Sequence, residues 1–144
     1  MGLDMYLTAE KYFSPYDDSL KKPRVGGIPK GFVVTTVCVR AAYWRKANQI
    51  HAWFVREIQN GEDECREHHV PREKLMELVA LCKKVIAEPE KAPELLPTKS
   101  GFFFGDTEYG EYYFEDLKDT VEQIEKVLSG FDEKFWDLTY RASW

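Results

Sequence analysis

The sequence has few cysteines, no long apolar run and no block of basic residues. The 3 cysteines, Cys38, Cys65 and Cys82, are widely spaced and form no C-x-x-C pair, which is typical of a reducing cytosol. No stretch approaches the roughly 20 apolar residues that cross a bilayer. Asp4 lies where a secretory signal would need basic and then apolar residues. We therefore expect a cytoplasmic chain that is neither exported nor membrane-spanning.

The formal net charge is −5, and lysines and arginines are scattered among acids. Binding to a phosphate backbone draws its affinity from clustered basic residues, so nucleic acid is disfavoured as a partner.

Metal and catalytic signatures are weak as well. Cys65-x-x-His68-His69 has the spacing of half a zinc site, but the other cysteines and His51 fall in expected core elements. The acidic cluster at residues 62–64 does not separate an acid role from a base role. The sequence therefore predicts no metal, no cofactor and no assigned catalytic residue.

A chain of 144 residues, 15% of them aromatic, is long enough to bury one sizeable core. Two domains would each be undersized, so residues 1–144 are expected to form a single domain.

Strands are expected in four places. Residues 3–10 alternate apolar and polar side chains, residues 31–40 are rich in β-branched side chains, and residues 136–144 alternate again. Residues 65–70 are typical of a short edge strand, whereas residues 14–30, rich in proline and glycine, predict a long loop.

Helical spacing of apolar residues predicts three helices. The first runs from Ala41 to the Asn60-Gly61 pair, the second begins at Pro71 and the third covers residues 111–128. Prolines at 89, 93 and 97 predict a stiff, non-helical connector. Because regular βαβ repetition is absent, we expect an α+β fold whose mainly antiparallel sheet has the three helices packed on one face.

Two segments are candidate binding sites. Trp44, Asn48 and His51 follow one another at helical spacing, with Arg45 beside them, and could hold a ring and polar groups of a ligand. The alternative is that Asn48 and His51 are hydrogen-bonded residues at the edge of the core and that Arg45 is solvated.

The second candidate is the phenylalanine-rich segment, which we define as residues 98–110, with the candidate site in residues 100–110. Its glycines would allow close backbone approach to a ligand before a helix N-terminus. The candidate residues are Ser100, Phe102, Asp106, Thr107 and Tyr109. No Gly-Lys-Ser/Thr follows, so this is not a P-loop, and a buried strand ending in a helix cap is the alternative. We expect the two segments to lie side by side and leave a cleft.

Three stretches carry a resemblance: MGLDMYL at residues 1–7, YWRKANQIHAWFV at residues 43–55 and PTKSGFFFG at residues 97–105. They resemble a family of small uncharacterised bacteriophage and prophage proteins, over most of residues 1–128. The resemblance implies an accessory phage product in the bacterial cytoplasm that binds a host protein, with counter-defence by inhibition as its use.

Two rival functions stay open. One is a small-molecule or nucleotide binder that uses Trp44, Asn48, His51 and the segment from Ser100 to Tyr109. The other is an enzyme with His51 as general base beside Asp106 or Glu108. The chain could be a monomer, or a homodimer if the C-terminal strand ending at Trp144 left an unpaired edge.

Overall fold

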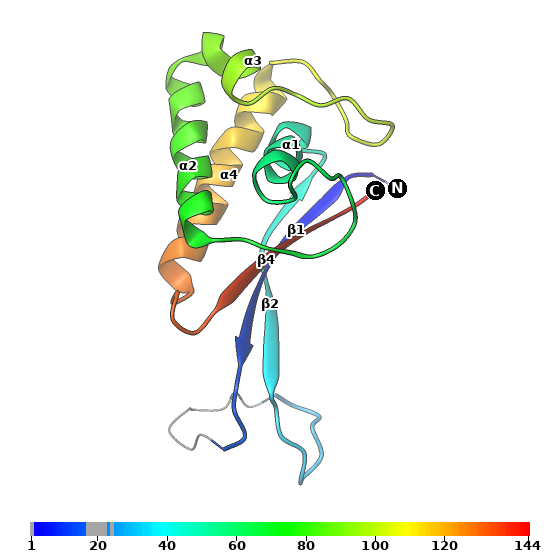
Figure 1. Cartoon of the computed structure of the whole chain (residues 1–144), viewed down its shortest axis with the longest axis vertical. Helices are drawn as coiled ribbons and strands as arrows, with labels where there is room; N and C mark the ends of the chain where they lie inside the picture. Colours follow the sequence, from blue (N-terminus) through cyan, green and yellow to red (C-terminus); the bar gives the residue numbers. More distant parts are fainter. Residues whose placement is uncertain (1, 17–22, 24) are drawn as a thin grey trace.

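The computed structural model of the chain describes residues 2–16, 23 and 25–144 (Figure 1). In chain order the elements are strands β1 (Asp4–Tyr12) and β2 (Thr36–Arg45), helix α1 (Asn48–Glu57), strand β3 (His68–His69), helix α2 (Arg72–Ala87), the 3-10 turn η1 (Pro89–Lys91), helices α3 (Ala92–Leu95) and α4 (Glu111–Gly130), and strand β4 (Asp137–Ser143). Part of the loop expected at residues 14–30 lies outside the described residues.

The strands form one sheet in the order β2-β1-β4-β3, and every neighbouring pair is antiparallel. Alternate residues of β1 (Met5, Leu7 and Ala9) are fully buried and face the helices, so the period of two seen in the sequence marks the core side. The expected α+β class with an antiparallel sheet is confirmed. The helices gather around the upper half of the sheet, and β1 and β2 continue below them as a projecting hairpin (Figure 1).

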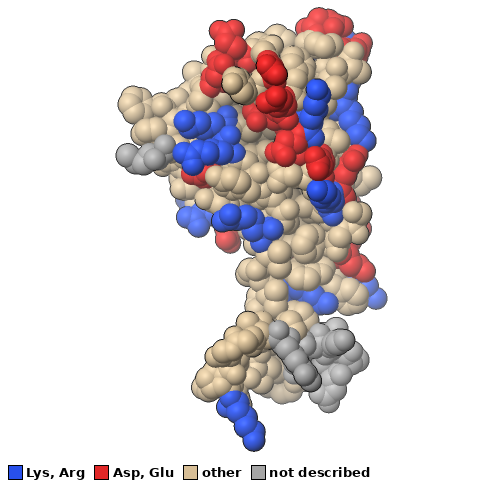
Figure 2. All heavy atoms as spheres, turned by 180° about the vertical axis from the view of Figure 1, so that it is seen from behind, with Lys and Arg blue, Asp and Glu red and all other residues tan. Residues whose placement is uncertain are grey.

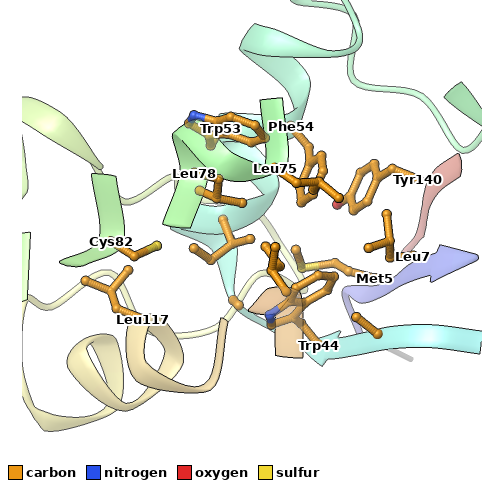
Figure 3. Close-up of a cluster of buried hydrophobic side chains, with 14 of the residues drawn as sticks. Met5, Leu7, Trp44, Trp53, Phe54, Leu75, Leu78, Cys82, Leu117 and Tyr140 are labelled. Carbon is orange, nitrogen blue, oxygen red and sulfur yellow. The ribbon is translucent and has the colours of Figure 1, made fainter. Parts of the chain in front are cut away.

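The core lies between the sheet and helices α1, α2 and α4 (Figure 3). Phe54 of α1 stacks on Tyr140 of β4 with ring centroids 3.8 Å apart and planes 4° apart. Leu78 and Cys82 of α2 and Leu117 of α4 extend the apolar cluster away from the sheet. Burial of large aliphatic and aromatic side chains supplies the main stabilising free energy of such a layer.

The boundary between β2 and α1 differs from the expected one. A helix was predicted from Ala41, but β2 continues to Arg45 because its residues pair with β1, as Trp44 does with Met5. Lys46 then adopts a left-handed backbone with φ 57°, and α1 begins at Asn48. Pairing with a central strand thus outweighed the helical spacing of apolar residues in this stretch.

The connector after α2 also departs from expectation. Instead of a wholly non-helical spacer it holds the turn η1 and the short helix α3, so the described residues contain one α-helix more than predicted. Proline is tolerated in the first turn of a helix, where its missing N–H costs nothing, and both short elements carry a proline there.

β2 is an edge strand, and part of its outer edge is covered by a side chain. The Gln123 amide of α4 accepts a hydrogen bond from the Tyr43 N–H and donates one to the Tyr43 carbonyl, both at 2.9 Å. The side chain thereby takes the place of a neighbouring strand at this residue. A register shift places Ala41 as an extra residue just before this point, between the pairs Thr8–Arg40 and Leu7–Ala42.

β4 is not an edge strand, since it lies between β1 and β3. β4 pairs with β3 at Thr139 and Tyr140, so the C-terminal strand does not leave the unpaired edge considered from sequence at these residues. The longer open edge of the sheet belongs to β2. None of the helices in the described residues is long and apolar enough to cross a membrane.

Replacing Gln123 with alanine should lower the free energy of unfolding by about 1–2 kcal/mol, because both backbone groups of Tyr43 lose their partner. Urea denaturation followed by circular dichroism measures the change. Glu122→Ala is the matched control on the same helix. It removes only a surface ion pair with Lys126, so its effect should stay below about 0.5 kcal/mol. Equal effects of the two substitutions would contradict the role given to the Gln123 amide.

Candidate functional site

His51 lies in the interior, in the first half of α1. Its side chain is 0% exposed, its Nδ1 lies 2.7 Å from the Tyr140 hydroxyl and its Nε2 lies 2.8 Å from Asp63 Oδ1. Because Asp63 accepts from Nε2–H, a neutral ring has Nδ1 free to accept from the tyrosine hydroxyl. One neutral tautomer therefore satisfies both contacts.

The chain of polar contacts ends at the surface. Lys99 Nζ donates to Asp63 Oδ2 at 3.0 Å, and both of these side chains are partly exposed. The imidazole is further enclosed by the rings of Phe104 and Trp144, with centroids 5.4 and 5.9 Å away. The contacts Tyr140–His51–Asp63–Lys99, which we call the polar chain, thus join β4, α1, the loop after α1 and the phenylalanine-rich segment.

The polar chain bears on the general-base hypothesis for His51. Burial lowers the pKa of the imidazole, although the hydrogen bond that its Nε2–H donates to Asp63 works in the opposite direction. The carboxylate beside His51 is Asp63, not Asp106 or Glu108 as considered from sequence. Since both ring nitrogens are engaged and the ring is wholly buried, the geometry gives His51 a structural role in this state.

Asn48 fastens the phenylalanine-rich segment to the start of α1. Its side chain is 1% exposed; its Nδ2 donates to the carbonyls of Phe104 and Asp106 at 3.0 and 2.9 Å, and its Oδ1 accepts from the Lys99 N–H at 3.0 Å. The two predicted segments therefore do meet, as expected. They pack directly against each other, and the side-chain amide of Asn48 makes its hydrogen bonds within this contact.

Trp44 is also part of the interior. The ring is 3% exposed, and its Nε1–H donates to Thr120 Oγ1 at 2.9 Å. Figure 3 shows it inside the apolar cluster beside Met5. The expected cleft in which Trp44, Asn48 and His51 face a ligand is not found in the described residues, because all three side chains are used to hold the chain together.

The candidates in the phenylalanine-rich segment are mostly at the surface. Ser100, Phe102, Asp106, Thr107 and Tyr109 are all exposed, and Phe102 is 94% exposed. Local bonds hold the segment in shape: the Asp106 carboxylate accepts from the Glu108 N–H at 2.9 Å, and the Thr107 carbonyl accepts from a threonine hydroxyl at position 98 at 3.0 Å. This favours neither a buried phenylalanine strand nor a loop closed over a ligand.

Two of the residues predicted as candidates, Arg45 and Asp106, border a hollow of about 240 Å³ between the starts of α1 and α4. Arg45 and Lys46 line it together with the carboxyl groups of Asp106 and Asp116. Burial raises the pKa of Asp116 to about 6, against the effect of a hydrogen bond from Gln49 Nε2 at 3.4 Å. The mixed charges would suit a small polar ligand and do not point to one class.

A further group of exposed apolar side chains lies between β1 and β2 and was not predicted as a site. We define the arm as the described residues between β1 and β2, namely 13–16, 23 and 25–35. Five of its apolar side chains are exposed: Tyr16, Val25, Ile28, Phe32 and Val33. The sequence carried one signal of this surface, namely apolar side chains among glycines and prolines. These residues had been assigned to a loop and to the start of a strand.

Comparison of the chain with family models, with curated proteins and with solved structures gives no significant match. Function therefore has to be argued from the surface of this chain.

Acidification should weaken the fold through His51. The folded state holds its pKa below the ordinary 6.5, so stability is complete above pH 6.5 and is lost as the pH falls toward the folded pKa. The slope should reach at most about 1.4 kcal/mol per pH unit. Urea denaturation between pH 8 and 5, for wild type and His51→Gln, measures this component.

In the His51→Gln variant this loss between pH 6.5 and 5 should be smaller than in wild type. If the variant does not fold, NMR titration of the wild-type imidazole provides the test, and a folded-state pKa at or above 6.5 would contradict the argument. The polar groups around the ring are those of Tyr140, Asp63 and Lys99. Because His51→Gln leaves these groups in place, the difference between the variant and wild type reports the titration of the imidazole in their presence.

The carboxyl carbon of Asp116 should titrate with a midpoint of about 6 in a pH series followed by NMR, against an ordinary value of 3.8. Replacing Gln49 with methionine should move the midpoint upward, because the hydrogen bond that favours the charged carboxylate is lost. A wild-type midpoint near the ordinary value would show that water reaches this carboxyl group.

Proposed function

We propose that this chain acts by binding another protein through the arm and the adjoining free part of β2. The observation that carries the proposal is the exposure of apolar side chains on a projecting hairpin. Phe32 is 72% exposed and Tyr16 is 93% exposed, although both could have been buried in a folded body. Several exposed apolar side chains in one segment are typical of protein interaction sites.

The described residues of the arm carry little charge, whereas the sequence places five charged residues among positions 17–22 and 24. Lys30 is the one charged side chain among its described residues, whereas the body mixes acidic and basic groups (Figure 2). Depletion of charge with enrichment of aromatic side chains is the composition found at the centre of protein interfaces. Gly27 and Gly31 have positive φ values of 86° and 94° and form the turns that bring the apolar side chains to the surface.

The free part of β2 continues this surface with backbone groups. The Phe13 N–H donates to the Thr35 carbonyl at 2.7 Å. Along an antiparallel strand, the backbone N–H and C=O groups of successive residues point alternately toward one neighbour and away from it. Since the Thr35 carbonyl points toward the chain of β1, the backbone groups of Thr36, Cys38 and Arg40 point away from β1. An extended segment of a partner could pair with them, as in β-strand addition. Beyond this point the edge is occupied by Gln123, which limits pairing to residues 36–40.

The resemblance to small phage proteins supports a host protein in the bacterial cytoplasm as the partner, and inhibition of a defence protein as the use. A compact body with a charge-poor arm suits an inhibitor that inserts apolar side chains into a groove of its target. The rival proposal of a small-molecule binder needed the ring of Trp44 and the imidazole of His51 to face a ligand. Both side chains are buried, and their polar atoms bind other residues of the chain.

Substitution of the arm should remove partner binding without unfolding the body. The double variant Ile28→Ser with Phe32→Ser is compared with wild type in affinity capture from bacterial lysate, followed by titration of the captured protein in pure form. We expect the dissociation constant to rise at least about tenfold. Thermal unfolding should change little, because both side chains are exposed.

Phe102→Ser is the matched control, since it removes an exposed phenylalanine that lies outside the arm. Binding should be retained in this variant. Failure to capture any partner with the wild-type chain, or equal loss of binding in the arm variant and the control, would refute the proposed use of the arm.

A further inference from the structure

The face of the sheet turned away from the helices carries a hollow lined by side chains of β1, β2 and β4. Because Met5, Leu7 and Ala9 face the core, the alternate residues Tyr6 and Thr8 face this open side. The hollow has a volume of about 430 Å³, which lies within the range of small-molecule sites.

Two arginines border the hollow, one on each side of β1. Arg40 of β2 pairs with Thr8, and Arg141 of β4 pairs with Tyr6. Neither guanidinium has a carboxylate within ion-pair distance in the part of the chain that the structure describes, whereas Arg45 and Arg66 do. Two charged donors without an ion-pair partner thus border the same hollow from β2 and β4, the two strands that flank β1.

Both guanidinium groups are restrained. Arg40 lies over two neighbouring tyrosine rings, 5.0 Å from the ring centroid of Tyr6 and 5.4 Å from that of Tyr43. Arg141 Nε donates to the Cys65 carbonyl at 3.2 Å, which leaves its two terminal nitrogens as donors. Restrained donors lose less conformational entropy on binding than flexible ones.

The remaining polar groups also suit an oxyanion. The hydroxyls of Thr8 and Ser143 line the hollow and can each donate one hydrogen bond. Among the lining residues the two arginines outnumber the one acid, Glu67, and a further carboxylate, that of Glu10, lies beside the hollow at 3.4 Å from Cys38 Sγ. Arginine presents a planar fork of donors that matches the oxygens of a phosphate group.

We propose that this hollow binds the phosphate group of a small phosphorylated molecule, with Arg40 and Arg141 as its two charged donors and the hydroxyls of Thr8 and Ser143 as further donors. The rest of the ligand lies over the open sheet beside Tyr6. The site does not use the apolar side chains of the arm, but it shares Arg40 with the free part of β2. Arg141→Gln on β4 therefore tests the hollow independently of the protein partner, whose binding this substitution should leave unchanged.

The test uses the ¹⁵N-labelled full chain, titrated with inorganic phosphate, AMP and adenosine at constant ionic strength. We expect saturable shifts for phosphate and AMP at the amides of Tyr6, Thr8 and Ser143, and none for adenosine at equal concentration. Arg40→Gln and Arg141→Gln should each raise the dissociation constant for AMP at least about tenfold.

Arg56→Gln is the control, because it removes the same charge from an exposed position on α1. It should leave the dissociation constant within about twofold of wild type, since charge at a distance is screened. The proposal is overturned if no saturable shift develops up to about 10 mM phosphate or AMP, if adenosine alone reproduces the shifts, or if Arg56→Gln weakens binding as much as Arg141→Gln.

Discussion

The stack of Phe54 on Tyr140 is the contact on which the rest of the structure depends. It joins the first helix to the strand at the middle of the sheet, and the hydroxyl of the same tyrosine reaches the imidazole of His51. Aromatic pairs of this kind contribute beyond the area that they bury. Because the tyrosine is wholly buried, its hydroxyl needs a partner, and the histidine supplies one. The side chain of Tyr140 therefore makes both an apolar and a polar contact between the sheet and helix α1.

The polar interior explains why so many distant segments meet at one place. Asn48 and His51 are one helical turn apart in α1, and each binds a segment that has no regular structure of its own. Buried polar groups are costly unless every donor and acceptor is satisfied. A network of this kind tolerates one arrangement of its members and so fixes the position of the phenylalanine-rich segment as firmly as apolar packing would.

The class of fold and the apolar faces of the long helices could be predicted from the sequence, since both follow from local periodicity. The end of β2 could not, because Tyr43 and Trp44 fit a helical stripe as well as a strand. Pairing of Trp44 with Met5, a contact between residues far apart in sequence, decided between them. The meeting of α1 with the phenylalanine-rich segment was foreseen, but the burial of Trp44, Asn48 and His51 depends on how closely the two pack.

The arm and the hollow on the open sheet were missed for a related reason. Exposure of Phe32 depends on whether any other part of the chain folds over it, and the approach of Arg40 to Arg141 depends on the order of strands in the sheet. Neither property is local. Residues that are unremarkable in sequence can thus form the most distinctive surface of the folded chain.

The Gln123 amide has a consequence for growth of the sheet. An uncovered edge strand lets identical molecules add to one another without limit, each new strand offering a fresh edge to the next. By occupying the backbone of Tyr43, the glutamine leaves a run too short for an endless ribbon. The strand that follows the exposed apolar side chains of the arm thus offers only a short edge to a second copy of the chain.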